Sequence, residues 1–361
     1  MNQITQQELF NNLIQHQAYL YRLSSSEIAV LIGQFNNLSN EMLTKLRDLL
    51  DELSDTERSA LMAGQYTTPT LKEIRSSIQV WQASILSTLP EAFAVSATAL
   101  AVHEAVYQAR VLGEKIKEPN AKTLYSKIRK KPMSGGVLLD YLFDKIADDA
   151  KLRVEQVIRD GLSQGQTNQQ IVQRIKGKKA LNYQDGILEQ SRSSIAALTR
   201  TARSHVSNQA MIDTYRALDV DWLKTVSTLD SKTCKFCASE DGKVYAIDDP
   251  SRPNHPTHPH SRTIFVPLLS KDGKTIGKRP SNSKVGDTGE ITTIDSNVKF
   301  PKWFDEQSEA FQRDWLGPSR YKLFKQGNYS IEKFVDPLSF QSFTLAELKK
   351  MDEKTFKELG L

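Results

Sequence analysis

Residues 231–262 read SKTCKFCASEDGKVYAIDDPSRPNHPTHPHSR, and this stretch decides how the rest of the chain is interpreted. It holds both cysteines of the sequence, Cys234 and Cys237, and three of its six histidines, His255, His258 and His260. A Cys-x-x-Cys pair offers two thiolates, and two imidazoles from the following loop would complete a tetrahedral zinc site. His255 can pair with either His258 or His260. The pattern therefore allows one structural zinc ion.

A second interpretation of the same stretch needs no metal and no other cofactor. The two cysteines would stay reduced beneath a loop, and the histidines would face solvent. Pro253, Pro256 and Pro259 fix the backbone around the histidines and could aim alternate side chains apart. A redox role would need a strand–CxxC–helix setting, which the sequence does not show. The zinc interpretation and the metal-free interpretation both stay open.

The composition is that of an ordinary globular protein. The chain has 361 residues, 39% of them hydrophobic, and a formal net charge of +5. This length suggests two or three domains. We find no apolar run long enough to cross a bilayer and no signal-peptide pattern, so we expect a reducing, cytosolic environment without a disulfide framework. The mild positive charge permits contact with nucleic acid or with an acidic protein surface.

Hydrophobic residues at steps of three and four predict helices over residues 1–118. Thr5 to Glu8 and Ser54 to Glu57 both fit a capping box at a helix start. Pro90 is expected to end or kink a helix that resumes afterwards. Residues 137–218 again show helical spacing, so most of the chain is expected to be α-helical.

Two short motifs resemble catalytic signatures but fail on context. His103-Glu104 has Tyr107 where a zinc protease would need its second histidine. Gly161-Leu162-Ser163-Gln164-Gly165 follows a charged helical stretch, whereas a hydrolase nucleophile follows a buried strand. We interpret Gly161 as a helix C-cap, with Thr167 starting the next helix.

Residues 119–136 interrupt the helical pattern with prolines, glycines and many cations. We predict a basic connection, which is either a solvated linker or a contact for phosphate or an acidic partner. Its candidate contact residues are Lys127, Arg129, Lys130 and Lys131.

A small sheet is expected around the cysteines. Residues 221–226 read as a strand that leads into the Cys-x-x-Cys turn, and residues 243–245 could pair with residues 263–266. The expected fold class is therefore mainly α-helical with a small central α+β module.

The end of the chain divides into two parts. Residues 270–300 are rich in Lys, Gly, Ser, Thr and Asp and predict a flexible linker. Residues 301–361 predict a helical tail with a large share of aromatic residues, which must cover their apolar surface against the chain itself, a neighbouring subunit or another protein. The candidate interface residues are Trp303, Phe311, Trp315, Tyr321 and Phe324.

The ordered motifs resemble one known family. Asp230 to Cys237 (DSKTCKFC), Asp241 to Tyr245 (DGKVY) and His258 to Arg262 (HPHSR) look like the core of the phage Mu F-like minor head proteins, also called phage head morphogenesis proteins. The resemblance covers roughly residues 137–268. The family pattern usually ends in His-Pro-x-Cys-Arg-Cys, and Ser261 and Thr263 stand here where cysteines would be. Two ligands of a family-like metal site are therefore missing.

The resemblance implies a non-enzymatic minor capsid protein of a tailed bacteriophage. It would assemble in the host cytoplasm, bind portal protein or major capsid protein inside the head near the portal, and assist head assembly or DNA delivery. Contact with packaged double-stranded DNA is compatible with its basic connection. The expected parts are a helical N-terminal domain (1–118), the basic connection (119–136), a Mu F-like module (137–269), the linker (270–300) and the aromatic tail (301–361).

Two alternatives come from the residues themselves. A zinc-dependent hydrolase or nuclease would use the Cys/His cluster, with Glu240 or Asp241 as general base. A DNA-binding protein ejected from the virion would use its cations and would bind duplex DNA in a salt-sensitive way.

Overall fold

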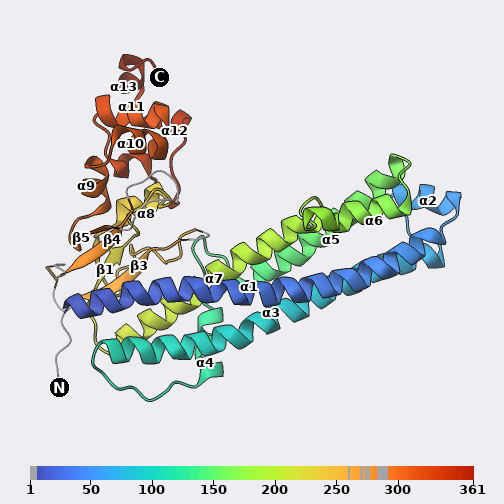
Figure 1. Ribbon diagram of the computed structural model, residues 1–361, viewed down its shortest axis with the longest axis horizontal. Helices are drawn as coiled ribbons and strands as arrows, with labels where there is room; N and C mark the ends of the chain where they lie inside the picture. The colour runs from blue at the N-terminus through green and yellow to red at the C-terminus, as the bar shows by residue number, and fades with distance from the viewer. Residues whose placement is uncertain (1–5, 259–260, 269–270, 273–276, 283–291) are drawn as a thin grey trace.

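The computed structural model describes residues 6–258, 261–268, 271–272, 277–282 and 292–361. Four long helices form an extended rod, a small sheet lies at one end of it, and the C-terminal helices form a lobe that stands beside the sheet (Figure 1). This arrangement confirms the expected fold class, mainly α-helical with a small α+β module.

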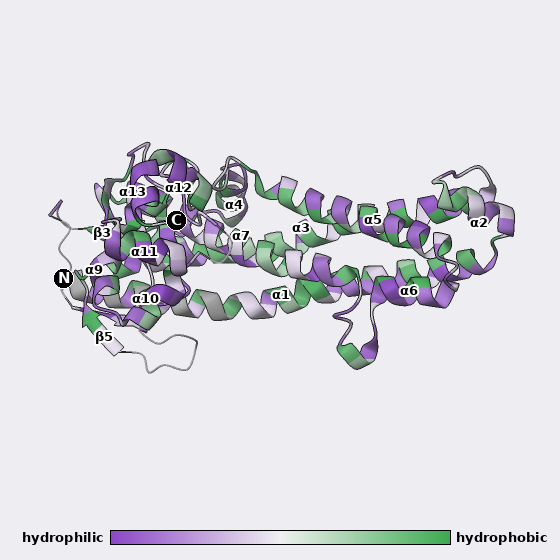
Figure 2. Cartoon of the chain, turned by 90° about the horizontal axis from the view of Figure 1, so that it is seen from above, coloured by the Kyte–Doolittle hydropathy of each residue, from purple (hydrophilic) through white to green (hydrophobic). Residues whose placement is uncertain are grey.

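The rod is built from amphipathic helices that share one hydrophobic core. Helix α1 has 46 residues and at about 1.5 Å per residue is roughly 69 Å long. The buried side chains of the core run from Leu20 to Ala210, and apolar and polar residues alternate along the long helices (Figure 2). The helices of this part are α1 (Gln6–Asp51), α2 (Asp55–Met62), α3 (Pro69–Val111), α4 (Ala121–Arg129), α5 (Leu139–Ser163), α6 (Asn168–Lys176), the 3-10 turn η1 (Lys179–Leu181) and α7 (Leu188–Ala217).

Because this core includes helices on both sides of residues 119–136, the residues before and after that connection pack together. The boundaries expected at residues 118 and 137 stay a prediction. Within the connection, residues 121–129 form helix α4, capped by the Asn120 side chain.

Helix α3 continues through Pro90, so of the two expectations, an end or a kink, the end is wrong and the kink stays a prediction. A proline inside a helix costs about 3 kcal/mol through the lost hydrogen bond and a steric clash. The flanking residues offset this by burial: Leu89 and Phe93 are almost completely inaccessible, and the Phe93 ring lies 5.8 Å from the Phe143 ring of α5.

Helix α3 is also more apolar than expected. By length and composition alone it could cross a membrane, since an 18-residue window has a mean hydropathy of 1.6 and 33% of that window is buried. This differs from the expectation that the chain holds no such run. One helix of this kind is weak grounds for a membrane span, because core helices pass the same test. In the structure α3 packs along α1, α5 and α7.

The joint between α5 and α6 depends on a glycine, but not in the expected way. Gly161 lies inside α5, and a Cβ atom there would meet the Ile171 side chain at 2.5 Å. The left-handed residue after the helix is Gly165, with φ +65°. The interpretation of Gly161 as the cap was therefore wrong, whereas Thr167 does begin α6 with a capping box. The capping box at Ser54 is also confirmed, and Thr5 lies outside the described residues.

The central sheet has the strand order β2-β1-β3. Strand β1 (Trp222–Val226) lies between β2 (Val244–Ala246) and β3 (Ile264–Leu268) and pairs antiparallel with both. Residues 243–245 and 263–266 were expected to pair with each other. They do not, because β1 lies between them in the sheet. A strand buried on all but its first residue is typical of a central position.

The C-terminal lobe has its own aromatic core. Strands β4 (Lys278–Ser281) and β5 (Thr292–Asp295) form a hairpin that leads into it. The helices of the lobe are α9 (Phe300–Asp305), α10 (Glu309–Leu316), α11 (Pro318–Gln326), the 3-10 turn η2 (Ile331–Phe334), α12 (Leu345–Met351) and α13 (Glu353–Glu358).

The aromatic residues proposed as a partner interface pack mainly inside this lobe. Trp303, Phe311 and Trp315 are 2%, 1% and 6% exposed, and Tyr321 and Phe324 pack against the same core while partly exposed. We expected these aromatic residues to pack against the chain itself, a neighbouring subunit or another protein. The structure shows them packed against the chain itself. The partner-interface prediction is therefore wrong for the three buried residues.

The linker expected over residues 270–300 is held to the rest of the protein at Arg279. Its guanidinium binds the Asp241 carboxylate at 2.9 and 3.0 Å and donates to the Ser227 carbonyl oxygen, and both charged side chains are almost fully buried. Residues 273–276 and 283–291 of this stretch lie outside the described residues.

Candidate functional site: a cysteine–histidine cluster

The cysteines lie where a short helix begins after strand β1. Helix α8 (Lys235–Glu240) has Cys234 as its N-cap residue, and the Cys237 amide donates to the Cys234 sulfur at 3.3 Å. The sequence reasoning missed this helix, because cysteine is not among the usual N-cap residues. The signal that could have found it is the segment DSKT before the pair, where Asp230 is a typical residue to begin a turn.

The turn that presents Cys234 is fixed by an ion pair. Both guanidinium nitrogens of Arg262 bind the Asp230 carboxylate, at 2.6 and 2.7 Å. Asp230 also accepts hydrogen bonds from the amides of Lys232 and Thr233. These contacts tie the segment before the cysteines to the segment after the histidines, so the two halves of the site keep a fixed separation.

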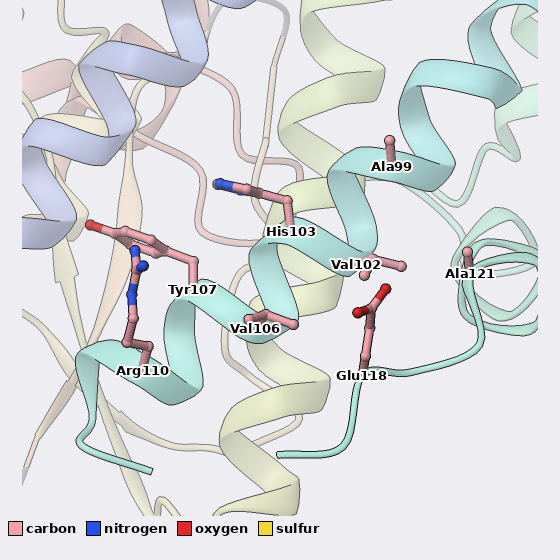
Figure 3. A pocket seen from close by; sticks show the side chains of 8 residues that line it. All are labelled: Ala99, Val102, His103, Val106, Tyr107, Arg110, Glu118 and Ala121. Carbon is pink, nitrogen blue, oxygen red and sulfur yellow. The ribbon is translucent and has the colours of Figure 1, made fainter. Parts of the chain in front are cut away.

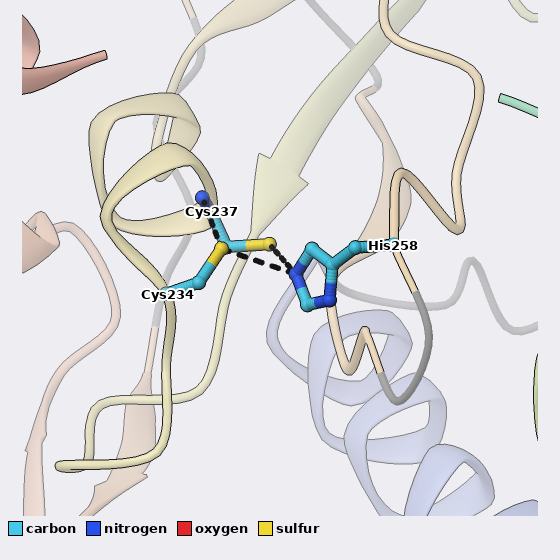
Figure 4. Close-up of side chains that lie close together, drawn as sticks. All are labelled: Cys234, Cys237 and His258. Atoms are coloured by element: carbon cyan, nitrogen blue, oxygen red, sulfur yellow. Dashed lines mark hydrogen bonds between the residues drawn. The ribbon is translucent and has the colours of Figure 1, made fainter. Parts of the chain in front are cut away.

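His258 is the histidine that faces the cysteines. Its Nε2 atom lies 3.1 Å from the Cys234 sulfur and 3.2 Å from the Cys237 sulfur (Figure 4). The three ligand atoms all lie within 4.8 Å of one another, with Cys237 buried and the other two residues partly buried. The expectation of solvent-facing histidines was therefore wrong for His258.

His255 lies elsewhere. It is 1% exposed, its ring centroid lies 4.9 Å from that of Phe265 at an interplanar angle of 51°, and it is not part of the ligand group. Burial, with a further contribution from Arg252, lowers the pKa of His255 to about 3. His260, the remaining candidate ligand, lies outside the described residues.

Among the described residues, Ser261 also lies beside the cluster. Its hydroxyl oxygen lies 3.7 Å from the Cys237 sulfur. Thr263, the other position at which the family pattern has a cysteine, instead shares a hydrogen bond with Ser227 at 3.0 Å.

The two thiols differ sharply in acidity. The hydrogen bond with Cys237, together with backbone amides at the start of α8, lowers the pKa of Cys234 to about 7. The same hydrogen bond and burial raise the pKa of Cys237 to about 12. Without a metal, Cys234 is thus the thiol that ionises first.

The three donors fit a zinc ion. Zinc–sulfur bonds of about 2.3 Å and zinc–nitrogen bonds of about 2.0–2.1 Å place tetrahedral ligand atoms roughly 3.5 Å apart. The observed separations of 3.1 and 3.2 Å need to widen by only a few tenths of an ångström. Two thiolates and one imidazole supply three of the four ligands.

The acidic residues proposed as a general base are occupied. Glu240 accepts hydrogen bonds from Lys243 at 2.6 Å and from Tyr245 at 2.5 Å. Asp241 accepts the Ser227 and Phe300 amides, each at 2.7 Å, in addition to Arg279. Both side chains are buried and hold local structure, so neither is placed to activate a water at the cysteines.

The basic residues of the connection do not form an unpaired cationic patch. Lys127 and Lys131 both bind Asp213, at 3.1 and 2.7 Å, and Arg129 binds Asp140 at 2.6 Å. Lys130 is exposed. The three paired cations, Lys127, Arg129 and Lys131, therefore help fasten α4 and the residues after it to α7 and to the start of α5.

A comparison with protein families finds one similarity in this region. Residues 152–265 match the family model described as phage Mu protein F like protein. This match confirms the resemblance and contains α6, α7, all three strands of the central sheet up to Phe265, and the three donors of the cluster. No curated protein matches the chain, and no solved structure does either.

Proposed function

We propose that this chain is a minor structural protein of a tailed-phage head, which binds portal protein or major capsid protein and assists head assembly or DNA delivery. The observation that carries the proposal is the match of residues 152–265 to the family described as phage Mu protein F like protein. The proposed location is the interior of the head near the portal.

A structural rather than catalytic role is supported by the surroundings of the cluster. Catalytic zinc needs an open ligand position and a base within reach of its water. Glu240 and Asp241 are instead engaged in hydrogen bonds and ion pairs. The pairing of Lys127, Arg129 and Lys131 with carboxylates likewise makes duplex DNA a weaker candidate partner than protein.

We further propose one structural zinc ion at Cys234, Cys237 and His258. When bound, it would take the place of the protons on the two thiols, which would pass to solvent, and would fasten α8 to the loop before β3. The fourth ligand would be Ser261, a water molecule or His260, which lies outside the described residues.

The head-protein proposal is tested by a nonsense mutation in the gene of the producing phage. Without the protein, we expect few infectious particles and heads with aberrant shape or unfilled interiors, and a plasmid copy should restore both. Mass spectrometry of wild-type particles should detect the chain in the head fraction. Particles that lack the chain yet assemble and infect normally would overturn the proposal.

The zinc proposal has a separate test. The purified protein should contain zinc bound at the cysteines, and the variant C234S/C237S should hold about one zinc per chain fewer than wild type. S231A, a neighbouring hydroxyl deletion outside the ligand group, is the matched control and should retain the metal. Zinc-free wild-type protein that also fails to take up added zinc would remove this proposal and leave the head-protein proposal standing.

A further inference from the structure

A second group of metal-ligand atoms lies on the opposite side of the sheet, where α1 passes α3. It consists of His16 from α1 and of His103 and Glu104 from α3, and their ligand atoms all lie within 4.8 Å of one another. His16 Nε2 is 2.6 Å from Glu104 Oε1, and His103 Nδ1 is 3.8 Å from the same oxygen. Sequence spacing cannot find this group, because its members come from helices that are remote in the chain.

The carboxylate of this group is held in one orientation. Glu104 is 0% exposed, and its second oxygen accepts the Gln108 amide at 3.4 Å. Gln108 in turn accepts the Tyr215 hydroxyl of α7 at 2.7 Å. This chain of hydrogen bonds turns Oε1 of Glu104 toward the two imidazoles. Residues that hydrogen-bond to a metal ligand commonly fix its orientation in this way.

The imidazoles are also preoriented. The His16 ring stacks on Tyr107 with centroids 3.9 Å apart and lies 5.5 Å from the His103 ring at an interplanar angle of 23°. Tyr107 stands where a zinc protease would have its second histidine. In this structure His16 from α1 supplies that second imidazole, and the Tyr107 ring stacks on it.

The group is reachable from outside. The His103 side chain is 50% exposed and lines a pocket of about 460 Å³ together with Tyr107, Arg110 and Glu118 (Figure 3). An ion could reach the group from the exposed side of His103, and water could take its remaining coordination positions.

From this geometry we propose that His16, His103 and Glu104 bind a divalent transition metal ion of the zinc or iron(II) class. Two imidazole nitrogens and one carboxylate oxygen are the donor set of His₂Glu zinc sites and of two-histidine, one-carboxylate iron sites. The contact between His16 and Glu104 opens when the ion binds between them, so the two ligand atoms move apart by several tenths of an ångström. The ion fastens α1 to α3 at the end of the rod that carries the sheet.

The competing explanation is a metal-free ion pair that only sets how α1 lies on α3. Cobalt(II) distinguishes the two, because thiolate ligands give an intense ligand-to-metal absorption that nitrogen and oxygen ligands lack. In the variant C234S/C237S we expect about one cobalt per chain, with weak visible bands and no thiolate band.

H103A should abolish this binding in the same background without loss of helical circular dichroism, because His103 is half-exposed and its ring is dispensable for the core. V102A, which changes another residue of the same pocket, should leave it intact. If C234S/C237S does not fold, wild-type protein should bind two cobalt ions and H103A one. Folded protein that binds no cobalt outside the cysteines would overturn the proposal, whatever the outcome for the phage head.

Discussion

Ser261 lies beside the Cys234–Cys237–His258 cluster, with its hydroxyl oxygen 3.7 Å from the Cys237 sulfur. Because a thiolate binds zinc far better than a neutral hydroxyl, S261C should raise zinc affinity at least about tenfold, or about 1.4 kcal/mol. Competition with a chromophoric chelator measures this. S251C, which adds a thiol at an exposed position of the same loop, is the control. Equal affinities of the two variants would show that residue 261 is outside the coordination sphere.

His205 makes stability depend on pH. Burial, with a smaller effect of Lys131, lowers its pKa to about 4, against about 6.5 in an unfolded chain. Between these values the unfolded state binds a proton that the folded state does not. As pH drops below about 6.5, protonation of His205 in the unfolded state should therefore lower the free energy of unfolding by about 1.4 kcal/mol per pH unit. Above that pH, His205 should make no pH-dependent contribution to the free energy of unfolding.

Urea unfolding of wild type and H205Q from about pH 7 to about pH 5 checks this prediction. The wild-type curve should be steeper by the slope given above. Parallel curves would mean that His205 binds its proton equally well in both states.

Which histidine would bind a metal could not be predicted from the sequence. His255 and His258 are both at plausible spacings from the cysteines, and the difference arises from the loop path: one ring is buried against Phe265 and the other lies over both sulfurs. The structure brings three of the candidates together, Cys234, Cys237 and His258, and both the chelate spacing and the family motif include them.

Among the elements, the β4–β5 hairpin is fastened to the sheet by one buried ion pair. In R279A, the Asp241 carboxylate would remain buried without its cation, which typically costs about 3–5 kcal/mol. We expect a loss of this size in urea unfolding and faster amide exchange in α9, whose Phe300 amide binds Asp241. K354A removes an exposed ion pair and should change stability by less than about 1 kcal/mol. Similar losses in both variants would contradict the assigned role.

Two glycines in helices should respond oppositely to alanine. At Gly161 the new methyl group would meet Ile171 of α6 at 2.5 Å, so G161A should destabilise the protein by about 1–3 kcal/mol. At Gly33 of α1 no atom lies within 4 Å, so G33A should stabilise it by about 0.5–1 kcal/mol. Thermal unfolding of both variants measures the difference. A stabilising G161A would mean that α5 and α6 are farther apart in solution.

Element types were predictable where local pattern decides, as in α7 and β1, and failed where distant contacts decide. The pairing of β2 with β3 was plausible by sequence order, yet β1 takes the central position because its side chains are buried on both faces. By local rules Pro90 is expected to end or kink a helix. Helix α3 continues through it because Leu89 and Phe93 on either side are buried in the core.

At the scale of the whole molecule, the rod makes the protein extended. A compact chain of 361 residues would have a radius of gyration of about 21 Å, whereas α1 alone spans roughly 69 Å. Small-angle X-ray scattering should give a radius of gyration well above the compact value and an asymmetric distance distribution. A value close to 21 Å would show that the rod folds back on itself in solution.

The contact between the first turns of α1 and the central sheet has a consequence for biosynthesis. Leu9 and Leu13 are buried against Val226, Ile264 and Val266. At about 5–20 residues per second, a ribosome takes on the order of 10–50 s to travel from one set to the other. During that interval the beginning of α1 exposes apolar side chains without their partners, and a nascent-chain chaperone is the natural protection for it.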